Sequence, residues 1–139
     1  MTHNYTTVPH CLRLVDVERV VVFSELHQEA VLRVAPGAEV ELTAMVPGTL
    51  KLSDQMKDDV AEKRHTFEIR NEGAQTLRQL ELLAKSRLMA LYEDEKGVQR
   101  VSGAPLYPLA LTYQQKGGTL QCTLTGRTPW LDLPVRGQN

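Results

Sequence analysis

The side chains that could do chemistry in this chain are few and scattered. Metal binding would draw on the histidines and cysteines, which are His3, His10, Cys11, His27, His65 and Cys122. Imidazoles, thiolates and carboxylates bind zinc, so His27 and Glu29 could join His10 and Cys11 as ligands. Residues two apart on a strand share a face, but the spacing of these four matches no zinc motif. We therefore expect no metal and no other cofactor.

Nucleophilic and acid–base catalysis leave no recognisable pattern either. A catalytic cysteine needs a neighbouring base, whereas Cys122 occupies an inward position of an alternating strand, where apolar surroundings raise a thiol's pKa. We expect Cys122 to be a buried small hydrophobe; a disulfide with Cys11 is the alternative, which cytosolic redox conditions disfavour. We expect no enzyme. The enzymatic hypothesis, which ranks third, requires His27, Glu29 and His65 to converge in a deep pocket.

Charge and hydropathy patterning argue against nucleic acid and membrane as partners. Sixteen basic and 17 acidic residues give a net charge of −1, without the basic excess that releases counterions from phosphates. Met1–Pro9 lacks the apolar run of a signal peptide, and no stretch approaches the roughly 18 apolar residues of a membrane span. We expect a cytosolic chain when it is made. The following basic residues interleave with acidic and apolar ones and are interpreted as solvated surface: Lys63, Arg64, Arg78, Lys85 and Arg87.

The chain is organised around residues 76–125, where one helix precedes four strands. Thr76 and Gln79 match a capping box, and apolar residues at helical spacing follow, which predicts a helix over about residues 76–85. Leu80, Leu82 and Ala84 also alternate, so a strand stays open as an alternative. The four strands that follow are expected to form an antiparallel meander: 87–94, 98–103, 108–115 and 119–126. Strand 87–92 is apolar on both faces and is predicted to be central.

The N-terminal half alternates in the manner of a sheet. Strands are predicted within 10–15, 18–26, 31–34, 40–46 and 64–70, with Phe67 and Ile69 directed inward. The charged segment over residues 50–63 is predicted to be an exposed loop or a short helix. At 139 residues, the chain is expected to fold as one mainly β domain, a β-sandwich or barrel-like structure with a C-terminal meander and one packed helix.

The two ends of the chain are expected to differ from this domain. Residues 1–9 are predicted to be a mobile arm, residues 10–128 the single domain, and residues 129–139 an apolar tail. The tail residues predicted to mediate interactions are Trp130, Leu131, Leu133 and Val135, which are costly to leave in water together. They should dock on the chain's own core or on a neighbouring subunit. Strand edges and such a tail favour an assembly component over a monomeric enzyme.

The phrase Gly97-Val98-Gln99-Arg100-Val101-Ser102-Gly103 precedes a proline-led strand, a Gly-Gly turn and a strand that ends at Gly126. Through this phrase, residues 83–128, about a third of the chain, resemble small prophage-encoded tail and virion structural proteins of gut bacteria. The resemblance implies a non-enzymatic role in building a phage tail or related particle, by self-association or docking to other virion proteins. It brings no catalytic residues with it.

A ligand-binding β module, for example for a carbohydrate, is the second hypothesis. Trp130, Tyr107 and Tyr113 would supply the stacking faces. Aromatic residues make up only 5% of the chain, which is lean for that purpose.

Overall fold

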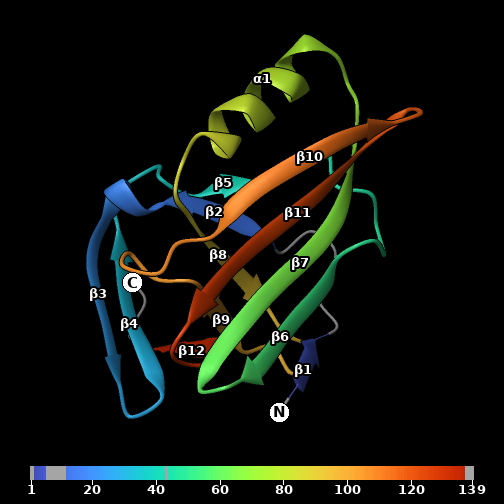
Figure 1. The fold of residues 1–139 in the computed structure, drawn as a ribbon. Helices are drawn as coiled ribbons and strands as arrows, with labels where there is room; N and C mark the ends of the chain where they lie inside the picture. Colours follow the sequence, from blue (N-terminus) through green and yellow to red (C-terminus); the bar gives the residue numbers. More distant parts are fainter. Residues whose placement is uncertain (1, 6–11, 43, 137–139) are drawn as a thin grey trace.

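The computed structural model describes residues 2–5, 12–42 and 44–136, which form two curled sheets and one α-helix (Figure 1). The predicted mainly β, sandwich-like fold with a single helix is confirmed.

The first sheet has five antiparallel strands in the order β1-β6-β7-β11-β10. Their bounds are β1 (Thr2–Tyr5), β6 (Lys51–Lys57), β7 (Val60–Arg70), β10 (Ala110–Lys116) and β11 (Thr119–Thr128). β7 and β11 pair without interruption from Ala61 opposite Thr128 to Arg70 opposite Thr119. β1 pairs with β6 although it falls in the predicted mobile arm, whose residues 1 and 6–9 lie outside the described part of the chain.

Residues 50–63 form a β-hairpin, so the prediction of a loop or short helix is wrong. Asp58 and Asp59 turn the chain with φ of 53° and 66°, the positive values that a two-residue type I′ hairpin turn requires. Glycine or asparagine usually supplies this geometry, and an Asp-Asp pair concealed the turn. On β6, Leu52 and Asp54 point inward and are buried, and the charge of Asp54 hid this alternation.

The second sheet has seven strands in the order β3-β4-β12-β9-β8-β2-β5. Their bounds are β2 (Arg13–Asp16), β3 (Val20–Leu26), β4 (Glu29–Val34), β5 (Val40–Glu41), β8 (Leu88–Glu93), β9 (Gln99–Ser102) and β12 (Leu133–Arg136). Its neighbours are antiparallel except β12 and β4. A short 3₁₀ turn, Val17–Arg19, leads into β3. The predicted strand over 40–46 is shorter than expected, since only Val40–Glu41 pairs with β2.

The four C-terminal strands form two hairpins that belong to different sheets. β8 and β9 lie in the seven-stranded sheet, whereas β10 and β11 lie in the five-stranded sheet, so the expected meander is divided. The chain crosses at Gly103, whose φ of 86° is strained for any residue with a side chain. Reciprocal backbone hydrogen bonds between Leu88 and Leu109, of 3.0 and 2.7 Å, then tie the two sheets together.

Helix α1 (Ala74–Ala84) lies at one end of the sheets, beside β10 (Figure 1). The predicted capping box is wrong, because the helix begins two residues earlier, with Gly73 as its N-cap and no side-chain cap. Thr76 is inside the helix, and its hydroxyl accepts a hydrogen bond from the Glu72 backbone N–H at 3.3 Å. Leu80 and Leu83 are buried, as their helical spacing predicts.

Two apolar clusters form the core, one on each face of β8. Leu88, Ala90 and Tyr92 belong to the cluster between the two sheets, together with Leu80 and Leu83 of α1. Met89 and Leu91 face the opposite way, toward a second cluster that is closed by β4 and β12. β8 is therefore buried on both faces, which confirms the prediction that it is central. Cys122 is a buried free thiol in the first cluster, as predicted, and Cys11 lies outside the described residues.

Candidate functional site

Two of the four tail residues predicted to mediate interactions are built into the chain's own seven-stranded sheet, and the other two directly precede it. Leu133 and Val135 lie on β12, which joins β4 to β9 and so connects the β3–β4 hairpin to the remainder of that sheet. Leu133 is buried in the second cluster, Val135 packs against it, and Leu131 is half-buried. Trp130 is also half-buried, and it lines a surface groove.

This groove, here called the aromatic groove, has a volume of about 220 Å³. It is lined by Phe23, Ser24, Glu25, Ala104, Pro105, Leu106, Tyr107 and Trp130. The Trp130 ring stacks on Phe23 with centroids 6.4 Å apart and an angle of 19°, and it meets Tyr107 edge-on at 5.8 Å and 80°. Tyr113, the third aromatic residue proposed for stacking, packs against the first core cluster instead.

Apolar side chains are exposed at and near the groove. Leu106 is 85% exposed and Tyr107 38%. On β3, Val21 and Leu26 are 57% and 53% exposed, and β3 is an edge strand of its sheet. Scattered exposed apolar residues are ordinary, but a concave apolar site next to them is typical of an interaction surface.

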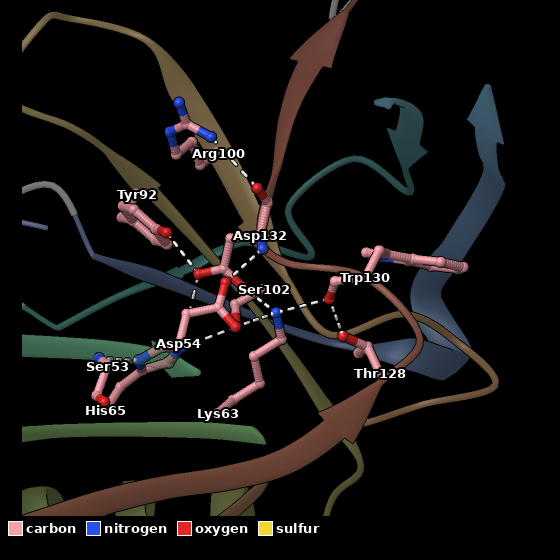
Figure 2. Close-up of polar contacts among 10 residues, drawn as sticks. All are labelled: Ser53, Asp54, Lys63, His65, Tyr92, Arg100, Ser102, Thr128, Trp130 and Asp132. Atoms are coloured by element: carbon pink, nitrogen blue, oxygen red, sulfur yellow. Dashed lines mark hydrogen bonds and ion pairs between the residues drawn. The ribbon is translucent and has the colours of Figure 1, made fainter. Parts of the chain in front are cut away.

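A cluster of buried polar side chains, here called the buried ion network, lies beside the Trp130 backbone (Figure 2). Its members come from both sheets and from the segment before β12: Asp54, Lys63, His65, Tyr92, Ser102 and Asp132. The Lys63 Nζ lies 2.7 Å from the Asp54 Oδ1 and 2.8 Å from the Asp132 Oδ1, and donates to the Trp130 carbonyl oxygen at 3.0 Å. The ammonium thus donates two hydrogen bonds, to Asp54 and to the Trp130 carbonyl, and forms an ion pair with the Asp132 Oδ1, which accepts no hydrogen bond from the side chains and backbone that the structure describes.

The two carboxylates share this single ammonium and differ in their ionisation. Burial raises the pKa of Asp54 and the nearby charge of Asp132 raises it further, whereas Lys63 and the Asp132 backbone N–H lower it without cancelling the increase. Burial also opposes ionisation of Asp132, but His65, Lys63 and the Tyr92 hydroxyl together hold its pKa below the ordinary value. Tyr92 donates to the Asp132 Oδ2 at 2.5 Å, and the Asp132 backbone N–H donates to the Asp54 Oδ2 at 2.5 Å.

The hydrogen bonds of His65 hold it in one neutral tautomer, and this tautomer determines whether the ring can act as a base toward Ser102. The Ser53 backbone N–H donates to Nδ1 at 3.2 Å, so the ring proton is on Nε2, which donates to the Ser102 Oγ at 2.8 Å. Burial lowers the pKa of His65, with Asp132 raising it and Lys63 lowering it further. A ring that donates to the serine oxygen cannot take the serine proton, so His65 and Ser102 are not arranged as base and nucleophile.

The network fixes the backbone that carries Trp130. The carbonyl oxygen of Trp130 accepts from Lys63 and from the Thr128 hydroxyl, and the Asp132 carbonyl accepts from Arg100 at 3.2 Å. Figure 2 shows the Trp130 ring pointing away from the network while its carbonyl faces Lys63. Buried charges therefore hold the segment before β12, and the aromatic ring projects from it toward the groove.

The phrase Gly97–Gly103 contributes two side chains to this arrangement. Arg100 donates to the Asp94 carboxylate at 2.8 Å as well as to the Asp132 carbonyl, and Ser102 meets His65. Burial opposes ionisation of Asp94, yet hydrogen bonds from Arg100 and two backbone N–H groups hold its pKa below the ordinary value. The phrase thus forms a turn, and two of its side chains contact the buried ion network and the segment that carries Trp130.

Sequence reasoning missed the network, and one prediction about it was wrong. Lys63 was assigned to the solvated surface but is 2% exposed, whereas Arg64 beside it is exposed as expected. A signal for Lys63 did exist: Phe67 and Ile69 point inward, so the same alternation along β7 places His65 and Lys63 on that face. No comparable signal marked Asp132, which lies outside any strand.

The residues proposed for an enzyme do not come together. His27 is exposed in the β3–β4 turn, with φ of 54°, and Glu29 begins β4, whereas His65 is enclosed in the network. The other proposed metal ligands, His10 and Cys11, lie outside the described residues. Among the residues that the structure places, no three histidine, cysteine or acidic side chains are grouped so as to hold a metal ion.

No family model, curated protein or solved structure matches the chain. Within residues 2–5, 12–42 and 44–136, no helix has both the length and the hydropathy needed to cross a membrane.

Proposed function

We propose that the protein is a non-enzymatic assembly component that associates with other proteins through the aromatic groove. One observation carries this proposal: Trp130 and Tyr107 line an open apolar groove whose backbone is anchored by the buried ion network. The setting in a phage tail or related particle is supported by the resemblance of residues 83–128. Both self-association and docking to another virion protein are consistent with it.

The composition of the groove favours a protein partner. Tryptophan and tyrosine contribute a large share of binding energy at protein interfaces, in pockets that a partner desolvates. Leu106, which lines the groove, is exposed, and Leu26, which follows the groove residue Glu25 along β3, is exposed as well. Anchoring of the Trp130 segment lowers the entropy that is lost on binding, because the site is ordered beforehand.

β3 could also contact a partner, by strand pairing, but its irregular geometry makes it poorly suited to this. It is an edge strand, and such strands can pair with another chain through unpaired backbone groups. The pairing of β3 with β4 shifts register between Val20 and Val22, and irregularities of this kind make an edge a poorer template. We therefore assign the specific contact to the groove, with β3 as its border.

The experiment compares surface variants in an association assay. Light scattering over a range of concentrations measures self-association, and binding to purified proteins encoded by neighbouring genes measures docking. Leu106→Lys and Leu26→Lys should each weaken the association about tenfold or more, because a charge enters a desolvated contact. Leu82→Lys is the matched control, since Leu82 is 64% exposed on α1 and should leave association unchanged.

Two results would count against the proposal. One is a strict monomer that binds none of the neighbouring gene products. The other is equal loss of association in Leu82→Lys and in the groove variants, which would move the interface away from the groove.

A carbohydrate-binding module is the second candidate. Trp130 and Tyr107 lie in one groove together with the polar side chains of Ser24 and Glu25, which could bind sugar hydroxyls. Tyr113 takes no part. A glycan array tests this function directly, and silence across the array would remove it.

A further inference from the structure

We infer that the aromatic groove accepts an arginine side chain of the partner protein, with its guanidinium against the aromatic rings and paired with Glu25. This inference rests on the proposed function and specifies the chemistry of the partner at the same site.

Three aromatic rings give the groove an affinity for cations. Phe23 and Trp130 lie nearly parallel, and Tyr107 stands almost perpendicular to Trp130, so the groove has aromatic walls in two orientations. Aromatic faces carry partial negative charge and attract a cation placed over them, tryptophan most strongly. An apolar partner side chain would also fill the groove but would leave this attraction unused.

Glu25 supplies a negative charge at the same place. It lines the groove from β3, is exposed, and forms no ion pair with any side chain that the structure describes. The other glutamate of this hairpin, Glu29, lies outside the groove lining and is 4.0 Å from the Arg136 Nε. None of the lining residues that the structure describes is a lysine or an arginine, so Glu25 sets the sign of the charge among them.

The shape of the site favours arginine on a protein over a small cation. A guanidinium is planar, stacks on aromatic faces and is less strongly hydrated than an ammonium, which suits a shallow groove with flat walls. The groove is open to the surface, and Leu106 in its lining is 85% exposed. A small cation would leave that leucine in water, whereas the residues flanking an arginine in a polypeptide can cover it.

The single tryptophan of the chain makes the inference directly testable, because Trp130 reports occupancy of the groove by its fluorescence. The probe is the blocked peptide acetyl-Gly-Leu-Arg-Leu-Gly-amide. Peptides with citrulline or lysine in place of arginine are its matched controls. The arginine peptide should change Trp130 emission saturably, the lysine peptide should bind several-fold more weakly, and the uncharged citrulline peptide about tenfold more weakly.

Variants separate the role of Glu25 from general effects. Glu25→Gln should weaken the arginine peptide about two- to fivefold, the range of an exposed ion pair, and should not change citrulline binding. Glu29→Gln on the same hairpin should change neither. Thermal unfolding of both variants verifies that they retain the fold.

The outcomes distinguish this inference from the proposed function. Equal binding of the arginine and citrulline peptides overturns it, as does tetramethylammonium chloride binding more tightly than the arginine peptide. If Leu106→Lys abolishes association but no arginine peptide binds, the proposed function stands and the arginine inference fails. If the peptide series shows the expected order while the protein associates with nothing, the groove takes arginine and the assembly role fails.

Discussion

The inner face of β7 changes character halfway along the strand. Its C-terminal half buries Phe67 and Ile69 against Cys122 and Leu120 of β11. Its N-terminal half buries Lys63 and His65 on the same face, with carboxylates and hydroxyls in place of apolar neighbours. The backbone pairing of β7 with β11 continues without interruption through both halves. Alternation therefore decides which face a residue occupies but does not decide the chemistry of that face.

The two halves contribute to the molecule in different ways. Phe67 and Ile69 stabilise the fold through apolar burial, roughly in proportion to the area removed from water. Buried charges are poor sources of stability, because desolvation offsets most of their attraction, and they are retained where they specify one arrangement. In this chain the arrangement so specified includes the Trp130 backbone, which Lys63 holds at 3.0 Å. We interpret the charged half of β7 as the support of the groove.

The largest effect is expected for Lys63→Met, which removes the ammonium and leaves Asp54 and Asp132 buried without a counter-charge. Breaking a buried ion pair by removing one partner costs about 3–5 kcal/mol. Urea unfolding measures the loss, and Arg64→Met is the control. Arg64 is the exposed neighbour on the same strand, so its replacement should change the free energy of unfolding by less than about 0.5 kcal/mol.

A second variant identifies the source of that loss. Adding Asp54→Asn and Asp132→Asn to Lys63→Met removes the unpaired charges and should restore a large part of the stability. If Lys63→Met unfolds at nearly the same urea concentration as the unmodified protein, the network is not held together by its ion pairs. The charged half of β7 would then contribute no more to the free energy of unfolding through its ion pairs than an uncharged half would.

Much of the fold could be predicted from alternation, but the network required contacts that no local pattern records. Apolar positions such as Leu120, Leu124 and Phe67 repeat with period two, and their burial follows from that period alone. The network instead joins Asp54 to Asp132 across 78 residues. Lys63 was assigned to the surface because it interleaves with acidic and apolar residues, whereas a lysine can be fully buried when it is paired. Its partners become known only once the two sheets are assembled.

Gly126 of β11 lies opposite Lys63, in the charged half of β7. A Cβ atom at this position would lie 2.6 Å from the Leu109 Cδ2 and 2.9 Å from the Pro108 carbonyl oxygen. Gly126→Ala should therefore destabilise the protein by about 1–3 kcal/mol, the range for overpacking a filled interior. Thermal or urea unfolding provides the measurement. Gly118→Ala is the control, because a Cβ atom there meets nothing within 4 Å; equal effects of the two substitutions would contradict the close packing at Gly126.

The charged half should also make stability depend on pH through His65. Burial lowers the pKa of His65 in the folded protein, while the unfolded chain titrates near the ordinary value of about 6.5. As the pH falls through about 6.5, the unfolded chain therefore binds a proton that the folded chain does not. The stability present above this pH should be lost below it, by at most about 1.4 kcal/mol per pH unit.

Unfolding of the protein and of His65→Gln between pH 8 and pH 5 tests this dependence. The difference between their free energies of unfolding should shrink as the pH falls, because only the unmodified protein loses the contribution of His65. Asp54 acts in the opposite direction in both proteins, since its raised pKa lets the folded chain bind a proton before the unfolded chain does. A difference that stays constant with pH would mean that His65 titrates alike in the folded and unfolded states.

The smallest effect concerns Cys122, which pairs with Phe67 in the apolar half. Burial raises the pKa of its thiol to about 12, so almost no thiolate is present at pH 8. In a Cys11→Ser variant, Cys122 is the remaining thiol. Ellman's reagent should then react with it only as urea unfolds the chain, and the native protein should stay unlabelled and keep its stability. Fast reaction in the absence of urea would show that the apolar half opens often enough to expose Cys122 to the reagent. The two halves of β7 would then differ in chemistry but not in how firmly they are closed.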